Sequence, residues 1–282
     1  MFNIFKQTKF YNINGINIEL NKGHMLNKFQ KQFCMYDRLI PYLAQMSRGG
    51  WIVDVGANVG DTLVAMLGST DSSILCIEPN ELFFKILSRN VYKCNCKYTN
   101  EIKVLQAFVS NVSGGNYSMD THTGTACKIS GDNGVPSFTL VDICKYMGIP
   151  LSSINLIKVD TDGFDYECFC GIKNKLADIS PVLYWENMFG KANKTNAYQG
   201  FSQLGEYLSS MGYVRFFIFD NYGNFLCDGD NKAYQTINDY LNRMDNLKTG
   251  KTFHYVDVVA CKADKEELVR NKIDEYCKSF ER

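Results

Sequence analysis

The strongest candidates for chemistry are two acids at the end of an apolar run. The segment from Ile154 to Asp160 has the pattern of a buried strand, and Asp162 follows it after one residue. Lys158 shares a strand face with Asp160, because side chains alternate along a strand. Ligands of parallel sheets bind beyond the carboxyl ends of the strands. Asp160 and Asp162 are therefore candidate general bases, and a buried Lys158 would hold the Asp160 carboxylate in an ion pair. A salt bridge with no chemical role is the alternative.

A histidine in a polar insertion is another candidate base. The stretch from about Ser110 to Ser137 is rich in Gly, Ser, Thr, Asn and Asp. Insertions of that length at the ligand end of a sheet are usually functional or mobile, so we interpret this one as a lid or acceptor loop. Within it, His122 titrates in the range that proton transfer needs, although a loop histidine is more often simply solvated.

A glycine-rich turn after another apolar run is typical of nucleotide binding. The run from Trp51 to Val55 leads into Gly56-x-Asn58-x-Gly60, and a helical segment, Asp61 to Leu67, follows at once. Glycine adopts backbone conformations closed to other residues and lets a ligand come close. The helix points its free N–H groups back at the turn. A glycine-rich turn that binds no ligand is the structural alternative.

Two departures from the dinucleotide fingerprint Gly-x-Gly-x-x-Gly argue against NAD. Asn58 replaces the middle glycine, and Asp61 stands in place of the third. A carboxylate at a helix start disfavours a pyrophosphate but suits a cationic ligand such as S-adenosylmethionine, which carries a sulfonium and an ammonium group. The next apolar run, Ile74 to Glu78, ends in an acid that can accept both ribose hydroxyls.

The sequence therefore predicts a site for S-adenosylmethionine around these turns. The residues expected to bind this cofactor are Asp54, Gly56, Asn58, Gly60, Asp61, Thr62, Glu78, Pro79 and Ser110.

The elements that must position these groups alternate along the chain. Strands are expected at 51–55, 74–78, 102–109, 154–160, 182–186, 213–219 and 253–260, with helices after the first two, a helix beginning near Phe201, and a further one between 233 and 246. Such alternation predicts an α/β fold with a doubly wound, mostly parallel, seven-stranded sheet.

The two ends of the chain are expected to add smaller elements to one domain spanning 1–282. An extension, 1–48, should hold a hairpin around Asn14-Gly15 and a helix from about Asp37 to Met46, with Asp37 as its cap. The catalytic core spans 49–262 with the 110–137 insertion, and the charged tail, 263–282, should form an amphipathic helix.

Composition excludes several classes of protein. Lys and Arg number 30 and Asp and Glu also number 30, so the formal net charge is zero, which argues against a protein built mainly to hold nucleic acid. No stretch approaches the ~18–20 apolar residues of a membrane span, and no export signal is recognised. The 11 cysteines are scattered, which favours free thiols in a reducing cytoplasm over zinc or disulfides.

Two segments together resemble the FkbM family of methyltransferases. They are the stretch Trp51 to Thr62 and the stretch Leu156 to Asp165, which match the family's Asp-x-Gly-Ala-Asn-x-Gly and Lys-x-Asp-x-Glu-Gly motifs. Asp162 stands where the family usually has Glu, which keeps the charge but shortens the reach by one methylene. The resemblance covers about residues 36 to 220 and implies a class I, S-adenosylmethionine-dependent O-methyltransferase.

The resemblance also suggests an acceptor. Many FkbM members are similar to tailoring enzymes of bacterial polysaccharides, lipopolysaccharides or other glycoconjugates, and Thr123 to Ala126 resembles the polysaccharide-type members. A sugar hydroxyl is a poor nucleophile, so a base or a metal must help it lose its proton. The order of an acid after one strand and Glu186-Asn187 after the next resembles catechol-type O-methyltransferases, which implies a Mg²⁺ site at Asp160, Glu186 and Asn187.

Other readings stay open on the sequence alone. A methyltransferase of the same fold acting on a nucleic acid or a non-sugar small molecule is the main alternative, although the Asn/Asp-Pro-Pro-aromatic motif of amino-methylating enzymes is replaced by Asp160-Thr-Asp-Gly. An NAD-dependent oxidoreductase and a non-catalytic module that retained the fold are further alternatives. The oligomeric state is not predicted.

Overall fold

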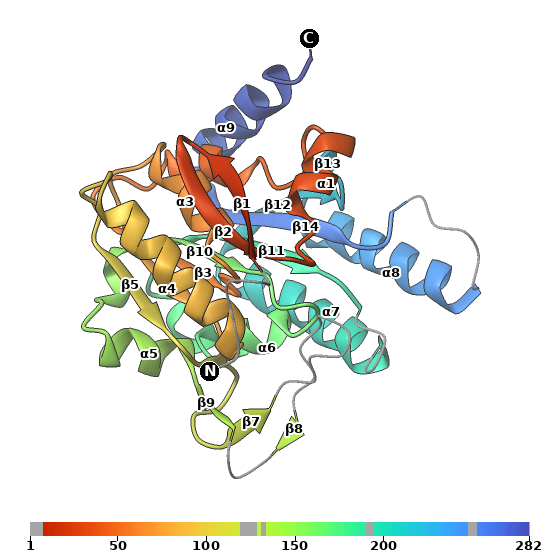
Figure 1. The fold of residues 1–282 in the computed structure, drawn as a ribbon. Coiled ribbons are helices and arrows are strands. Elements are labelled where there is room, and N and C mark those ends of the chain that lie inside the picture. The colour runs from red at the N-terminus through yellow and green to blue at the C-terminus, as the bar shows by residue number, and fades with distance from the viewer. Residues whose placement is uncertain (1–7, 119–128, 131–133, 190–193, 248–252, 282) are drawn as a thin grey trace.

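A mixed eight-stranded sheet organises the computed structural model, which describes residues 8–118, 129–130, 134–189, 194–247 and 253–281 (Figure 1). The strand order is β13-β12-β14-β11-β10-β3-β4-β5. Its members are β3 (Trp51–Val55), β4 (Ser73–Ile77), β5 (Ile102–Leu105), β10 (Ile154–Val159), β11 (Val182–Asn187), β12 (Tyr213–Asp220), β13 (Phe225–Gly229) and β14 (Val256–Lys262). The predicted doubly wound α/β architecture is confirmed.

The parallel half of the sheet contains the strands with the candidate motifs. β5, β4, β3, β10 and β11 run parallel to one another, whereas β14 is antiparallel to both β11 and β12. The carboxyl ends of β3, β4, β10 and β11 therefore share one edge of the sheet, as predicted. The eighth strand, β13, was not predicted; it pairs with β12 through a tight turn in which Gly223 has a φ of 89°.

The predicted strand 102–109 is wrong as a single element. β5 ends at Leu105, and β6 (Phe108–Val109) pairs instead with β9 (Val135–Phe138) in a small sheet that also holds β7 (Asn116–Ser118) and β8 (Ile129–Ser130). The small sheet thus occupies part of the 110–137 insertion. His122 and the Thr123–Ala126 segment lie outside the described residues, so the predicted lid stays a prediction.

Helices cover both faces of the main sheet. One apolar core lies under α5 (Leu140–Tyr146), α6 (Asp165–Cys170), α7 (Lys194–Ser210) and α8 (Asn231–Leu247). The other lies under α2 (Ile40–Ala44), α3 (Asp61–Leu67), α4 (Glu81–Asn95) and α9 (Glu266–Lys278). Short 3-10 turns at 151–153, 173–175 and 263–265 lie in the connections between these elements. The charged tail forms α9 and buries Val269, Ile273 and Tyr276, as an amphipathic helix should.

The N-terminal extension forms the expected hairpin but a shorter helix than predicted. β1 (Thr8–Ile13) and β2 (Ile16–Asn21) are antiparallel around Asn14-Gly15, and α1 (Leu26–Gln32) follows. The helix predicted from Asp37 to Met46 is only α2, capped at Leu39. Asp37 does not cap it, because α2 begins only at Ile40 and its N-cap position is Leu39; Asp37 itself has a left-handed backbone, with a φ of 54°.

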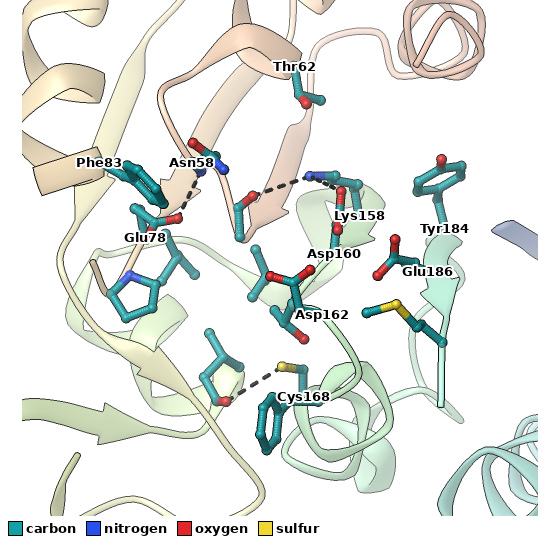
Figure 2. A pocket seen from close by; sticks show the side chains of 18 of the residues that line it. Asn58, Thr62, Glu78, Phe83, Lys158, Asp160, Asp162, Cys168, Tyr184 and Glu186 are labelled. Atoms are coloured by element: carbon teal, nitrogen blue, oxygen red, sulfur yellow. Dashed lines mark hydrogen bonds and ion pairs between the residues drawn. The ribbon is translucent and has the colours of Figure 1, made fainter. Parts of the chain in front are cut away.

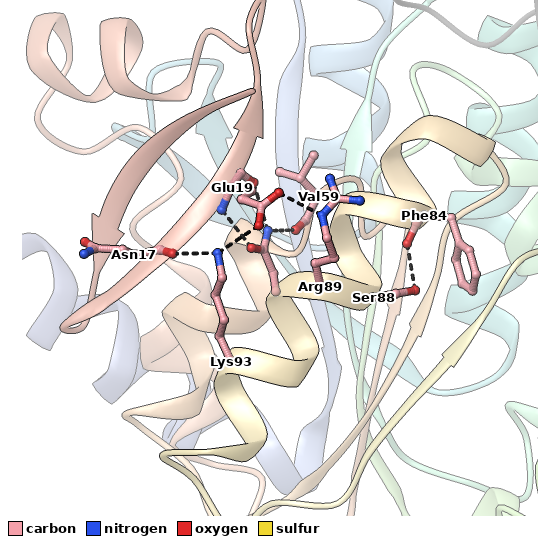
Figure 3. A network of polar contacts seen from close by, with 8 residues as sticks. Asn17, Glu19, Val59, Phe84, Ser88, Arg89 and Lys93 are labelled. Carbon is pink, nitrogen blue, oxygen red and sulfur yellow. Dashed lines mark hydrogen bonds and ion pairs between the residues drawn. The ribbon is translucent and has the colours of Figure 1, made fainter. Parts of the chain in front are cut away.

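A polar network fastens the hairpin beside the glycine-rich turn (Figure 3). Glu19 of β2 accepts from Arg89 and Lys93 of α4 at 2.8 and 3.1 Å. The Asn90 side chain accepts from the backbone N–H of Glu19 at 2.7 Å and donates to the carbonyl of Val59 at 2.7 Å. Because Asn90 is fully buried, these bonds fix the hairpin, α4 and the turn relative to one another.

No helix in the described part of the chain is long and apolar enough to cross a membrane.

Candidate active site

The carboxyl ends of the parallel strands enclose a pocket of about 350 Å³ (Figure 2). The turn after β3 and the acid after β4 form one end of it, and β11 and β14 form the other. Asp160 and Asp162 lie between the two ends, in the loop that leaves β10. The pocket therefore brings the two predicted motifs together.

Gly56 is required by its protein neighbours as well as by any ligand. Its φ is 78°, and a Cβ at this position would lie 1.8 Å from the carbonyl oxygen of Asp160. The Gly56 N–H donates to the carbonyl of Ile77 at 2.9 Å. The turn after β3 can thus lie against both β4 and the β10 loop only if residue 56 has no side chain.

Asn58 offers an unused acceptor at the same turn. Its backbone is left-handed, with a φ of 49°, and its N–H donates to the Glu78 carboxylate at 2.8 Å. The Asn58 Oδ1 atom is buried and has no hydrogen-bond partner among the residues that the structure describes. A buried acceptor without a partner is costly, so this atom fits a donor supplied by a ligand.

Glu78 connects the ends of two strands. One oxygen of its carboxylate accepts from Asn58 N–H, and the other accepts from Asn80 N–H at 2.7 Å. Burial raises the pKa of Glu78 to about 7, despite these two bonds. Each carboxylate oxygen has a second lone pair, so Glu78 can still accept from two hydroxyl groups in the pocket.

Lys158 joins three elements below the pocket. Its Nζ lies 3.0 Å from Asp54 Oδ1 and 3.5 Å from Asp160 Oδ2, and it donates to the Gly56 carbonyl at 3.4 Å. Burial alone would lower the pKa of this ammonium, but the two carboxylates outweigh burial and raise it. The predicted ion pair with Asp160 is present, and Asp54 proves to be a second partner.

Asp162 is held in an unusual backbone conformation at the centre of the pocket. It has a φ of 55°, and three of the four non-glycine residues described with positive φ, Asp37, Asn58 and Asp162, line this pocket. Backbone strain of this kind concentrates at functional sites. Burial, followed by the nearby Asp160 carboxylate, raises the pKa of Asp162 to about 6, which suits a general base.

Asp165, to which the sequence assigned no role, organises the β10 loop. It is fully buried and accepts from both the backbone N–H and the hydroxyl of Thr161, at 3.2 and 2.8 Å. It also accepts from the backbone N–H of Glu186 at 3.2 Å. Asp165 therefore fixes the loop that carries Asp160 and Asp162 to the end of β11.

Glu186 and Asp257 form an acidic pair at the β11–β14 end. The two residues are direct cross-strand partners, and both line the pocket. Asp37 lines the same pocket from the loop before α2. Sequence reasoning missed Asp37 and Asp257 as site residues, because neither belongs to a motif and the antiparallel pairing of β14 with β11 was not predicted.

The predicted magnesium triad is not assembled by the described residues. Asn187 does not line the pocket; its amide oxygen accepts from Tyr234 at 2.7 Å, and its nitrogen donates to Asn238 at 2.7 Å. The side chain is fully buried on the opposite face of the sheet from Glu186. No group of three or more His, Cys, Asp or Glu side chains in the described part of the chain is arranged to hold a metal ion.

Most of the other predicted site residues come together in the pocket. Those lining it are Gly56, Asn58, Asp61, Thr62, Glu78, Pro79, Lys158, Asp160, Asp162 and Glu186. Asp54, Gly60 and Ser110 do not line it: Asp54 lies behind Lys158, Gly60 caps α3, and Ser110 follows the pocket residue Val109. These three residues are therefore not placed to contact a ligand in the pocket directly.

The buried acids should make the ligand-free protein less stable as the pH rises. Burial raises the pKa of Glu78 and Asp165 to about 7 and of Asp162 to about 6, above the ordinary values of about 4. The folded state then binds more protons than the unfolded state between about pH 4 and 7, so stability falls across that window. Denaturant midpoints measured under reducing conditions from pH 5 to pH 8 should decrease; an increase would contradict these shifts.

A family model described as the methyltransferase FkbM domain matches residues 54–215. No curated protein sequence matches the chain significantly.

Solved structures similar to the chain include two described as methyltransferases and one protein bound to AdoMet. Methyltransferase FkbM from Methylobacillus flagellatus KT is 16% identical over 49% of this chain, with a TM-score of 0.37, and the match spans only 32% of that protein. An O-methyltransferase from Bacillus cereus in complex with SAH is 10% identical, covering 80% of each chain, with a TM-score of 0.46. TYW2 of M. jannaschii in complex with AdoMet is 10% identical over 90% of this chain and 85% of that one, with a TM-score of 0.44.

The family model covers more than half of the chain, including the glycine-rich turn, the β10 loop and the end of β11. The chain therefore belongs to the FkbM family of methyltransferases.

Proposed function

We propose that this protein is an S-adenosylmethionine-dependent O-methyltransferase whose acceptor is a sugar hydroxyl, in a precursor of a bacterial-type polysaccharide, lipopolysaccharide or other glycoconjugate. The observation that carries the proposal is the shared pocket. Within it, the acceptor groups of Asn58 and Glu78 lie at one end, and the carboxylates of Asp160 and Asp162 stand beside them. The sugar acceptor comes from the family resemblance and is tested separately below.

The turn end of the pocket has the groups that the cofactor requires. Glu78 suits the two ribose hydroxyls, and the unpartnered Asn58 Oδ1 suits a donor such as an amine. Phe83 and Pro79 supply apolar surface next to Glu78. When bound, S-adenosylmethionine supplies a methyl group on a sulfonium, and the carboxylates around the pocket favour such a cation.

The chain's own carboxylates would prepare the acceptor oxygen. Asp162, with its pKa raised to about 6, is the group we assign to take the hydroxyl proton. Asp160, held by Lys158, would position the acceptor beside it. Asp165 and the glycine turn keep this loop in place, and positioning contributes much of the rate in an in-line transfer.

The alternative acceptors differ in charge. Eight carboxylate side chains, but only one lysine, are among the described residues lining the pocket. Such a surface repels phosphate, which dominates the affinity of nucleic-acid binding, so a nucleic-acid acceptor is disfavoured. A non-sugar small molecule with a hydroxyl group remains the second candidate.

Two measurements test the proposal. Calorimetry should detect binding of S-adenosylmethionine, and an enzyme lacking such binding would overturn the whole assignment. Transfer of a labelled methyl group should then be assayed with polymer-linked sugars, free glycosides and RNA, each with and without a chelator. Label in a sugar ether that survives chelation supports the proposal, label in RNA overturns the sugar assignment, and chelator-sensitive transfer would restore a metal to the site.

Replacing Glu78 by glutamine should weaken cofactor binding by about 10- to 100-fold, because bonds to a charged acceptor contribute about 1.5–3 kcal/mol each. The glutamine nitrogen also cannot accept from Asn58 or Asn80 N–H, so one backbone donor is left unpaired. Isothermal titration gives the affinity directly. Glu81→Gln is the matched control: Glu81 is exposed at the start of α4 and pairs only with Lys85 among the described residues. Equal affinities for the two variants would remove Glu78 from the cofactor site.

A further inference from the structure

The β11–β14 end of the pocket holds two carboxylates for which the described residues supply no countercharge. Glu186 and Asp257 are direct partners in the antiparallel pairing of β11 and β14. Directly opposed residues have Cβ atoms about 4.5–5.5 Å apart, and like charges in that arrangement destabilise a sheet. Burial, and then the neighbouring carboxylates, raise the pKa values of both acids. The pair therefore costs stability in the ligand-free protein.

Glu186 lines the pocket and has a carboxylate oxygen without a partner. The residue is only 9% exposed, and its Oε2 atom is buried with no hydrogen-bond partner among the described residues. Figure 2 shows its carboxylate facing the same space as Asp160 and Asp162. A buried acceptor oxygen that faces a cavity fits a donor carried by a ligand.

The protein itself does not neutralise this end of the pocket with the residues described. Lys158 and His24 are the basic side chains in the described lining. Lys158 is already occupied by Asp54, Asp160 and the Gly56 carbonyl. His24 Nδ1 accepts from the backbone N–H of Leu26 at 3.3 Å, so this nitrogen is already occupied by the backbone.

Three tyrosines line the same pocket as the acidic pair, and the side chain of one of them, Tyr184, is hydrogen-bonded to Asp257. Tyr184 precedes Glu186 by two residues on the same face of β11, and Tyr36 and Tyr255 line the same pocket. Tyrosine rings attract a cation held over their faces. Carboxylates together with tyrosine rings are thus complementary to an ammonium group rather than to a neutral or anionic one.

The acidic pair lies away from the end assigned to the cofactor. β11 is three strands along the sheet from β4, which ends at Glu78, and β14 is four strands along. At about 4.8 Å between neighbouring strands, these separations are about 14 and 19 Å. Glu186 and Asp257 therefore belong to the acceptor's end of the pocket, with Asp160 and Asp162 between them and the ribose site.

We propose that the acceptor is an amino alcohol, such as an amino sugar, whose ammonium group is bound by Glu186 and Asp257 in the pocket that Tyr36, Tyr184 and Tyr255 also line. This inference rests on the proposed O-methyltransferase function and narrows its substrate class. Exposed Asp37 adds a further carboxylate to the lining of the same pocket. Anionic sugar nucleotides are correspondingly poor acceptors, because their diphosphate would face these acids.

The test compares matched acceptors: methyl glucosaminide, its N-acetyl derivative and methyl glucoside, at a pH where the amine is protonated. The amine should be preferred in kcat/KM by about 10-fold or more, the effect of one charged hydrogen bond. Glu186→Gln should remove that preference and raise KM for the amine, while leaving cofactor affinity within about twofold. Asp257→Asn is the second variant if Glu186→Gln fails to fold.

Glu78→Gln serves as the control. It should weaken binding of the cofactor but leave the ratios of kcat/KM among the three acceptors unchanged. Binding of the amine, measured by calorimetry with S-adenosylhomocysteine present, separates this inference from the proposed function. Amine binding that depends on Glu186 without O-methylation supports the inference and overturns the O-methyltransferase. Equal use of all three acceptors, or Mg²⁺ or Ca²⁺ binding that is lost in Glu186→Gln, overturns the inference.

Discussion

Replacing Asp162 by asparagine is expected to lower kcat/KM by about 10²- to 10⁴-fold, the usual contribution of a general base. Asparagine keeps the size of the side chain and tolerates the left-handed backbone at this position, where φ is 55°, so the loss would reflect chemistry rather than folding. The pH–rate profile of the native enzyme should show an acidic limb near the raised pKa of Asp162, about 6. That limb should be absent from the variant.

Asp160→Asn is the comparison that makes this assignment testable. Asp160 is partly exposed and lies 3.5 Å from the Lys158 ammonium, so its substitution should reduce the rate by misplacing the acceptor while the acidic limb is retained. Cofactor affinity, measured by titration, should stay within a few-fold in both variants. If Asp160→Asn loses the limb and Asp162→Asn keeps it, the roles of the two acids are reversed.

The fold could be predicted because its strands are long apolar runs separated by turn residues. β3, β4, β10 and β11 are largely buried on both faces, so their sequences are mostly apolar runs with few polar residues. β13 was missed because it is an exposed edge strand, Phe225–Gly229, whose side chains bury little. The prediction of one strand over 102–109 was wrong because the chain leaves the main sheet at Gln106. The residues after it, Phe108 and Val109, pair with a segment about 30 residues further along the chain.

The two ends of the pocket differ in how far the sequence predicted them. The cofactor end depends on local backbone geometry, so Gly56, Asn58 and Glu78 can be recognised from the sequence immediately around them. The acceptor end depends on long-range pairing: Asp257 reaches it only because β14 inserts between β11 and β12. Asn187 shows the reverse error. It follows Glu186 in sequence, but alternation sends its side chain to the opposite face of the sheet, where Tyr234 and Asn238 bind it.

The structure also gives Asp54 a different role from the predicted one. The family motif begins with this residue, which suggested contact with the cofactor, but its side chain lies fully buried beneath Lys158. It therefore acts on the site through Lys158, which in turn holds Asp160 and the Gly56 carbonyl. One buried lysine thus connects the cofactor turn to the catalytic loop.

Replacing Lys158 by methionine is consequently expected to destabilise the fold by about 3–5 kcal/mol, the typical cost of removing one partner from a buried ion pair. Folded domains are stable by only about 5–15 kcal/mol, so the loss is a large fraction of the total. Methionine matches the length and apolar stem of lysine, and the missing ammonium is the main change. Urea unfolding monitored by the two tryptophans would measure the difference in free energy.

The pH dependence identifies Asp54 as the source of that loss. Burial raises the pKa of Asp54, and Lys158 opposes the rise; without the ammonium, burial acts unopposed. A carboxyl group whose pKa is raised in the folded state destabilises the protein increasingly as the pH rises above its unfolded value of about 3.9. Lys158→Met should therefore cost more stability at pH 8 than at pH 5. The double variant Asp54→Asn/Lys158→Met leaves no buried charge at this position, so it should recover much of the stability and lose the additional pH dependence. A double variant no more stable than Lys158→Met would show that the lysine supports the fold through Asp160 and the Gly56 carbonyl instead.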